Sequence, residues 1–194
     1  DLHSFPTRRS SDLHIVSSAS GWSRRAHTVE LPAASAAASE LSAQLLRERV
    51  QTIGGFADQY DIPMELAEAI YDIALSEGIT PWLAFRLVKV ESNFKSGARS
   101  PRDAIGYTQV QVATARFYQA GITEEQLYDR DTNLRIGFRF LKDLMRQFDY
   151  NVEHALLAYN RGPARVQGIL AAGGDPRNGY SAAIMKARPK AGAS

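Results

Sequence analysis

Apolar residues recur at three- and four-residue intervals along most of this chain, a spacing that is typical of amphipathic α-helices. The stretch from Asp131 to Phe148 shows it most clearly, because it carries two apolar stripes and therefore predicts a central helix covered on two sides. The stripes are formed by Leu134, Phe138, Leu141, Met145 and Phe148, and by Ile136, Phe140 and Leu144.

The same helix carries a row of basic residues, Arg135, Arg139, Lys142 and Arg146. Such a row usually faces solvent. The alternative is an interaction with anionic groups of a polymeric substrate.

Other stretches with helical spacing precede and follow this segment. A helix over Glu40–Tyr60 contains Gly54-Gly55, where a break is possible because glycine weakens a helix by about 1 kcal/mol relative to alanine. Between Asn93 and Gln109 we expect a long loop with no hairpin and at most a short strand. The remaining predicted helices are Pro63–Glu77, one from Pro81 that ends before Gly97, Val110–Tyr118, Glu124–Tyr128, Val152–Tyr159, Ala164–Ala172 and Tyr180–Ala187.

The pattern therefore predicts an all-α protein of about eight helices with at most a minimal β element. We expect residues 1–35 to be a disordered or artefactual tail, because they lack a sustained period and SFPTRRSSDL resembles translated sequencing-adapter sequence. They also show no signal-peptide pattern. We expect residues 36–62 to form a helical extension and residues 63–190 to form the main domain.

Composition narrows the class of protein. The 194 residues are 44% hydrophobic and 23% charged, as in soluble globular proteins, and no apolar run is long enough to span a bilayer. The net charge of +2 is too small to indicate a nucleic-acid-binding protein. With no cysteine and four scattered histidines, we expect neither a thiolate metal site nor a cluster of histidine ligands.

Glu91 is the main candidate for chemistry. It lies three residues after Val88 and four after Leu87, so it leans towards the apolar side of its helix, and it falls near the helix C-terminus. Both features disfavour the ionised carboxylate and predict a raised pKa, suited to a proton donor near neutral pH. By spacing alone, a solvated glutamate at a helix end remains the alternative.

Short polar or aromatic clusters on predicted loops and helix ends are further candidates: Glu91-Ser92, Ser100-Pro101, Gly106–Gln109 and Ala158-Tyr159-Asn160. Each has an ordinary structural interpretation when taken singly. Tyrosine at a helix end is often a core aromatic, and glutamine after a glycine turn is often a surface residue or a cap.

Taken in order, these clusters resemble the catalytic domain of the soluble lytic transglycosylases, family 1 type. The likeness covers about Pro63 to Ala187. Five segments match the family pattern. They are ITPWLAFRLVKVESNF, the helix that leads to Glu-Ser; SPRDAIGYTQ in the loop; DTNLRIG at a helix start; AYNRGPARV at a turn; and GYSAAIMKA near the end.

The resemblance implies a lysozyme-like helical domain around a substrate groove, acting on peptidoglycan glycan strands without metal or cofactor. Glu91 would be the single acid/base that cleaves the bond between N-acetylmuramic acid and N-acetylglucosamine and forms a 1,6-anhydro ring. Ser100 and Gln109 would contact the sugars. The other residues implied at the substrate site are Tyr159, Asn160 and, as weaker candidates, Ser92 and Tyr180.

The resemblance also implies an exported protein of the periplasm or cell envelope, and we expect a monomer. Asn133 is expected to cap or brace a helix. Two alternatives stay open: a muramidase that hydrolyses the same bond, and a non-catalytic peptidoglycan-binding module.

The chain departs from the family pattern in the loop. Asp103 stands where the pattern has glycine; we interpret it as a surface residue, although a second carboxylate near Glu91 would change the mechanism. Tyr107-Thr108 replaces Leu-Met, and Gln111 stands where related enzymes often carry Met, so we expect a more polar cleft.

Overall fold

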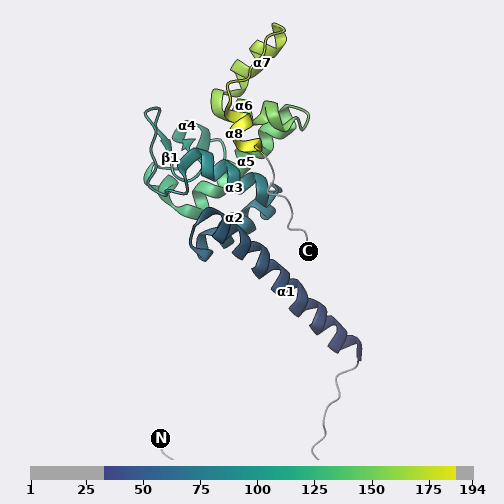
Figure 1. Cartoon of the computed structure of the whole chain (residues 1–194). Helices are drawn as coiled ribbons and strands as arrows, with labels where there is room; N and C mark the ends of the chain where they lie inside the picture. The colour runs from purple at the N-terminus through teal and green to yellow at the C-terminus, as the bar shows by residue number, and fades with distance from the viewer. Residues whose placement is uncertain (1–32, 187–194) are drawn as a thin grey trace, which may run out of the picture. The chain divides into compact units, whose positions relative to one another are not determined.

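The computed structural model describes residues 33–186 of the chain (Figure 1). The chain divides into two units, Asp1–Leu41 and Ser42–Ser194, and of the first unit only the start of one helix is described. Most of the predicted tail, residues 1–35, lies outside the described residues. The predicted divisions at residues 35 and 62 therefore stay predictions.

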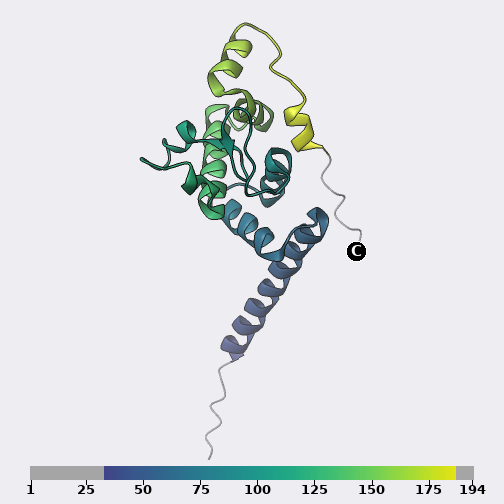
Figure 2. The same ribbon diagram turned by 90° about the vertical axis from the view of Figure 1, so that its left-hand side faces the viewer.

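Helices make up nearly all of the regular structure in residues 33–186, so the predicted all-α class is confirmed. Residues 172–179 return from α7 to α8 without regular structure (Figure 2). The elements are α1 (Ala33–Tyr60), α2 (Met64–Ser76), α3 (Pro81–Ser92), β1 (Ala104–Ile105), β2 (Val110–Gln111), α4 (Val112–Ala115), the 3-10 helix η1 (Glu125–Tyr128), α5 (Arg130–Gln147), α6 (Val152–Arg161), α7 (Pro163–Ala171) and α8 (Tyr180–Met185).

Two local predictions were wrong, and one possibility is not realised. Helix α1 continues through Gly54-Gly55 without the break that glycine makes possible, because Ile53 and Ala57 on either side of the pair are buried in the core. Of the segment Val110–Tyr118, predicted as one helix, only Val112–Ala115 is α-helical, and Val110-Gln111 form strand β2. The loop after α3 does contain a hairpin, in which Ala104 pairs with Gln111 and Ile105 with Val110. Its strands are two residues long, too short for the alternating pattern that reveals strands in a sequence.

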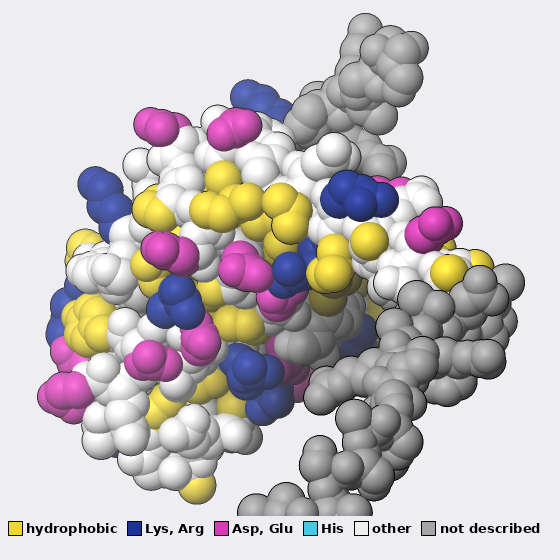
Figure 3. Space-filling view, turned by 90° about the horizontal axis from the view of Figure 1, so that it is seen from below, with side chains coloured by type: hydrophobic (Ala, Val, Ile, Leu, Met, Phe, Trp, Pro, Cys, Tyr) yellow, Lys and Arg dark blue, Asp and Glu magenta, His cyan; other side chains and the backbone are white. Residues whose placement is uncertain are grey.

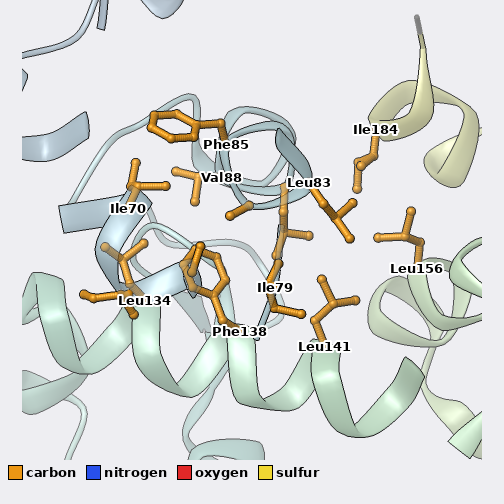
Figure 4. Close-up of a cluster of buried hydrophobic side chains, with 14 of the residues drawn as sticks. Ile70, Ile79, Leu83, Phe85, Val88, Leu134, Phe138, Leu141, Leu156 and Ile184 are labelled. Atoms are coloured by element: carbon orange, nitrogen blue, oxygen red, sulfur yellow. The ribbon is translucent and has the colours of Figure 1, made fainter. Parts of the chain in front are cut away.

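The core lies between α5 and the helices packed around it. Figure 4 shows Phe138 and Leu141 of α5 facing Leu83 and Val88 of α3 and Ile79 just before α3. Full burial of each such side chain stabilises the fold by about 1.5–3 kcal/mol. Further buried side chains come from α2, α6 and α8, namely Ile70, Leu156 and Ile184.

A second, smaller cluster lies beneath the hairpin. It joins Ile105 and Val110 of the two strands to Leu127 of η1 and Ile136 of α5. The predicted double covering of α5 is thereby confirmed: one apolar stripe packs in the main core, and Ile136 supports the hairpin.

The basic row of α5 mainly binds the end of α2. Arg135 Nη1 lies 3.0 Å and Arg139 Nε 2.7 Å from the carboxylate of Glu77, whose side chain is only 9% exposed. Lys142 Nζ donates to the carbonyl of Gly78 at 2.9 Å. Cations beside a helix C-terminus are stabilising, so these three residues have a structural partner and carry little support for a polymer-binding role.

Acidic and basic side chains are interspersed on the face shown in Figure 3. That mixture agrees with the small net charge of +2. Among the described helices, none is long and apolar enough to cross a membrane.

Candidate active site

Glu91 occupies the last turn of α3. The helix ends there because Asn93 adopts a left-handed conformation, with φ of 51°, and its N–H donates to the carbonyl of Lys89. The prediction that the helix ends before Gly97, with Glu91 near its C-terminus, is confirmed. Leu87 and Val88, one turn earlier, are fully buried, whereas Val90 is 38% exposed and does not belong to the buried stripe.

A cleft of about 430 Å³ opens over Glu91. Burial of the carboxyl group disfavours its charged form and raises its pKa from 4.5 to about 7, although a hydrogen bond from Tyr180 partly offsets this effect. The predicted rise is thus confirmed, with burial as its main cause. No second carboxylate from residues 33–186 lines this cleft.

Tyr180 reaches Glu91 from α8, near the other end of the domain sequence. Its hydroxyl donates a hydrogen bond to Glu91 Oε1. Burial, followed by the charge of Glu91, raises the pKa of Tyr180 well above 10, so its hydroxyl keeps its proton and remains a donor. The amphipathic spacing of α8 could not reveal this contact.

Arg86, two turns of helix ahead of the end of α3, holds α8 in place. Its Nε donates to the carbonyl of Ile184, and its Nη2 donates to the carbonyl of Ala183 at 3.2 Å. These carbonyls lie in the last turn of α8, where a helix leaves its C=O groups without partners. Arg86 thus links α3 and α8, the two helices that carry Glu91 and Tyr180.

The hairpin segment forms the facing wall of the cleft. Ser100 Oγ accepts hydrogen bonds from the backbone N–H of Arg102 at 3.2 Å and of Ala104 at 3.1 Å. Gln109 Nε2 donates to the carbonyls of Ala98 at 3.1 Å and Gly106 at 3.0 Å. The side chains of Ser100 and Gln109 therefore add hydrogen bonds to the backbone of this segment, where the two-residue strands supply few of their own.

Asn133 anchors this wall to α5 from the buried side. Its Oδ1 accepts from the N–H of Thr108 at 2.8 Å, and its Nδ2 donates to the carbonyls of Ile105 and Leu127 at 2.9 Å each. Asp129, rather than Asn133, caps α5 by accepting from the N–H of Thr132. Asn133 was predicted to cap or to brace a helix. It caps none, but it braces α5 against the hairpin segment and η1, so the second alternative is confirmed.

Gly137 explains the glycine of the DTNLRIG segment. A Cβ at this position would lie 2.3 Å from Oγ1 and 2.4 Å from Cβ of Thr108, a separation that packed atoms do not tolerate. Asn133 and Gly137 therefore act together, one by bonding the hairpin and the other by letting it approach α5.

Tyr159 and Asn160 line the cleft from the end of α6. The Tyr159 hydroxyl donates to the carbonyl of Thr108 at 2.8 Å, and its ring lies 5.0 Å from the Phe140 ring between centroids. Burial raises the pKa of Tyr159 well above 10. Asn160 Oδ1 accepts from Asn178 Nδ2 at 2.9 Å.

The structure brings most of the predicted site residues together. The cleft is lined by Glu91, Ser100, Gln109, Tyr159 and Asn160. Tyr180 joins them through its hydroxyl group. Ser92 does not line the cleft: it is buried, and its Oγ donates to the carbonyl of Val88, so its placement gives no support to contact with substrate.

The expected increase in cleft polarity was right for Gln111 and wrong for Tyr107-Thr108. Gln111 lines the cleft. Thr108 is fully buried and its hydroxyl bonds Asn133, while Tyr107 packs partly against the main core.

Asp103 lies outside the cleft lining. Its side chain is 76% exposed and pairs with Arg99, with Oδ1 2.8 Å from Nη2. This placement agrees with its interpretation as a surface residue.

Sequence reasoning missed several residues of the cleft. Phe140 had been assigned to an inner stripe, and its spacing gave no sign that it borders the cleft. Arg161 directly follows the Ala-Tyr-Asn motif, so its position was a usable signal. The full set of missed lining residues is Arg102, Ala104, Val110, Thr114, Phe140, Arg161, Gly162 and Pro163.

Comparison with known proteins places the chain in a family. The chain is 33% identical to the soluble lytic murein transglycosylase of Escherichia coli (strain K12) over 90 residues, which cover 43% of this chain and 14% of that protein. Among solved structures, an inactive glutamate-to-glutamine mutant of lytic transglycosylase Slt from Pseudomonas aeruginosa matches with 27% identity and a TM-score of 0.54, over 63% of this chain and 22% of that one.

The 70 kDa soluble lytic transglycosylase from Escherichia coli has the same fold, with 24% identity and a TM-score of 0.53 over 68% of this chain and 22% of that one. The chain thus spans only a small part of the length of each relative. The family described as the transglycosylase SLT domain matches residues 68–177, more than half of the chain. This protein therefore belongs to the transglycosylase SLT domain family.

Proposed function

We propose that this chain is a peptidoglycan lytic transglycosylase that cleaves the β-1,4 bond between N-acetylmuramic acid and N-acetylglucosamine and forms 1,6-anhydro-N-acetylmuramic acid. One observation carries the proposal: Glu91 has a pKa of about 7 and lines a cleft to which no other described residue contributes a carboxylate. Membership of the SLT family and the names of the relatives support it. A location in the periplasm or cell envelope, where the substrate is found, is part of the proposal.

The proposed reaction uses one carboxyl group twice. Protonated Glu91 gives its proton to the glycosidic oxygen as the bond from that oxygen to the muramoyl C1 breaks. The resulting carboxylate then takes the proton of the muramoyl C6 hydroxyl, whose oxygen bonds to C1 and closes the anhydro ring. Because the substrate supplies this nucleophile in place, a second enzyme carboxylate is not required.

The surrounding groups serve this cycle. Tyr180 donates to the Glu91 carboxylate and stabilises it between the two proton transfers. Ser100 and Gln109 contact sugar hydroxyl or acetamido groups from the hairpin wall. Tyr159 forms an aromatic surface beside Glu91, and Asn160 extends the polar lining on the same side.

Product analysis tests the proposal. Purified sacculi digested by the wild-type protein should release muropeptides with anhydro ends, detected by mass spectrometry. Glu91→Gln should lower the rate by about 10²–10⁴-fold, the usual contribution of a general acid or base. Asp103→Asn is the matched control, because it neutralises the carboxylate that lies outside the cleft.

Two outcomes would refute the proposed reaction. Products with reducing ends only would identify a muramidase. Binding to sacculi without release of muropeptides by either wild type or Glu91→Gln would identify a non-catalytic module.

A further inference from the structure

The segment between α7 and α8 is fastened to the end of α6 beside the cleft. Arg161 Nη1 donates to the carbonyl of Pro176, and Asn178 Nδ2 donates to Asn160 Oδ1 at 2.9 Å. Asn160 and Arg161 both line the cleft. Because α8 begins at Tyr180, two residues after Asn178, a side chain of this segment can act on the cleft and on α8 together.

The amide group of Asn178 can bond in one orientation only. Its Oδ1 accepts from the backbone N–H of Tyr180 at 3.2 Å. A backbone N–H is always a donor, so the oxygen of the amide must face Tyr180 and its NH2 group must face the other way. Gly179 lies between the two residues with φ of 84°, which glycine adopts without strain. Asn178 thus closes the backbone turn from which α8 starts.

The orientation of Asn178 fixes that of Asn160. Because Asn178 presents its NH2 group, Asn160 must present its oxygen, and the 2.9 Å contact joins these two groups. Within residues 33–186 the NH2 group of Asn160 then has no hydrogen-bond partner, although Asn160 is exposed in the cleft lining. The cleft therefore offers a donor at this point, which suits an oxygen acceptor such as the carbonyl of an acetamido group.

The other contact of Asn178 supports the helix that carries Tyr180. Helix α8 has only six residues, so it has few backbone hydrogen bonds of its own. Asn178 bonds its first N–H, and Arg86 bonds the carbonyl of Ile184 near its other end. Between these two contacts, the Tyr180 hydroxyl donates to Glu91.

From these contacts, we propose that Asn178 is a positioning residue for the reaction: it turns the NH2 group of Asn160 towards the glycan and holds the start of α8 so that the Tyr180 hydroxyl stays on Glu91. Asn178 lies outside the cleft lining and acts through its two neighbours. The first role rests on the proposed function for its substrate, whereas the second is a property of the protein without substrate.

Two substitutions separate the roles. Asn178→Ala removes both contacts, whereas Asn178→Ser keeps an oxygen that can accept from the N–H of Tyr180 but lacks the amide donor for Asn160. Asn178→Ala should raise the pKa of Glu91 by about 0.5, because the bond from Tyr180 is partly lost, and Asn178→Ser should leave this pKa unchanged. NMR titration of the Glu91 carboxyl carbon in the whole protein measures both.

Turnover on sacculi tests the first role. Well below the pKa of Glu91, both variants should raise the sacculus concentration at half-maximal rate by about fivefold, the size of one neutral hydrogen bond. The maximal rate should stay within about twofold of wild type, because Glu91 is protonated there in every variant. Gln51→Ala, which removes an exposed amide of α1 outside the cleft lining, should change neither the pKa of Glu91 nor the half-saturating concentration.

The two measurements also keep this proposal apart from the proposed function. If wild type releases no products from sacculi, the proposed function fails, and the pKa of Glu91 in the two variants still decides the role of Asn178 at α8. An unchanged pKa of Glu91 in Asn178→Ala would overturn that role. Half-saturating concentrations equal to that of wild type in both variants would overturn the role at Asn160.

Discussion

The two walls of the cleft are built in different ways. On one side, Glu91, Tyr159 and Tyr180 stand at the ends of helices whose apolar faces form the main core. On the other side, Ser100 and Gln109 belong to irregular backbone that is held by hydrogen bonds from side chains. The comparison separates two needs: a carboxyl group with a raised pKa requires burial, whereas contact with a sugar requires polar groups near solvent.

The departures from the family pattern named above fall on the hairpin wall. Asp103 is exposed, Thr108 faces α5, and Gln111 holds the backbone of Arg102. None of the three is among the causes of the raised pKa of Glu91, which are burial and the hydrogen bond from Tyr180. A wall built from local hydrogen bonds can thus change its sequence while Glu91 keeps its burial.

The largest expected effect concerns the anchor of the hairpin wall. Asn133→Ala should lower the free energy of unfolding by about 4 kcal/mol, because it leaves the N–H of Thr108 and the carbonyls of Ile105 and Leu127 buried without partners. Urea denaturation measures the loss. Thr108→Val is the matched control and should cost about 1 kcal/mol, since it removes only hydroxyl contacts. Equal costs for the two variants would contradict Asn133 as the anchor.

On the helical wall, the burial of Glu91 should cost stability at alkaline pH. The pKa of Glu91 is raised in the folded state from 4.5 to about 7, so the contribution of Glu91 to stability should be most favourable below pH 4.5 and should fall as the pH rises to about 7. Glu91→Gln lacks this titration and should be stabilised relative to wild type by up to about 3 kcal/mol more at pH 8 than at pH 4.

Urea unfolding of both proteins at the two pH values measures this difference. Glu48→Gln, at an exposed position of α1, should show a difference of only about 0.5 kcal/mol or less. If Glu91→Gln behaves like this control, the carboxyl group is not buried in the folded protein.

The link between α3 and α8 should be weaker without Arg86. Arg86→Ala should lower the opening free energy of α8 by about 2 kcal/mol, because the carbonyls of Ala183 and Ile184 lose a charged donor. Hydrogen exchange of the α8 amides measures the opening. Arg86→Lys keeps the positive charge but lacks the paired N–H donors of the guanidinium. It should therefore restore only part of the protection of the α8 amides from exchange. Unchanged exchange in Arg86→Ala would show that α8 is held by its apolar contacts alone.

Tyr180→Phe should change the pH dependence of turnover more than its maximum. The hydroxyl lowers the pKa of Glu91 by bonding its carboxylate, so its removal should raise that pKa further above 7. Because the acid acts when protonated, the alkaline fall in rate should move upward by about one pH unit, equivalent to about 1.4 kcal/mol. Tyr150→Phe, at an exposed tyrosine, is the control and should leave the profile unchanged.

The smallest effect is expected at Asp103. Asp103→Asn should keep turnover within about twofold and stability within about 0.5 kcal/mol, because the residue is exposed and its pairing with Arg99 is solvated. Asparagine also tolerates the positive φ of 56° at this position. Steady-state rates on sacculi decide the matter, and a large loss would make Asp103 a second catalytic carboxylate.

Much of the helical wall could be predicted from the sequence. The apolar spacing of α3 placed Glu91 at a helix end beside Leu87 and Val88, and the two stripes of α5 were correctly assigned to two packing partners. These predictions succeed because helical periodicity is local and repeats over several turns. The hairpin escaped prediction because its two-residue strands are too short to show a period.

The sequence by itself thus determined most of the helices, most of their buried positions and the position of Glu91 at the end of one of them. Only the tertiary structure decided that Tyr180 bonds Glu91, that Arg86 holds α8 against α3, and that Arg102 and Arg161 line the same cleft. The physical reason is the separation along the chain of the residues that interact. Periodicity describes neighbours along one helix, whereas burial of a carboxyl group and the meeting of side chains from different elements in one cleft depend on packing between segments far apart in the chain.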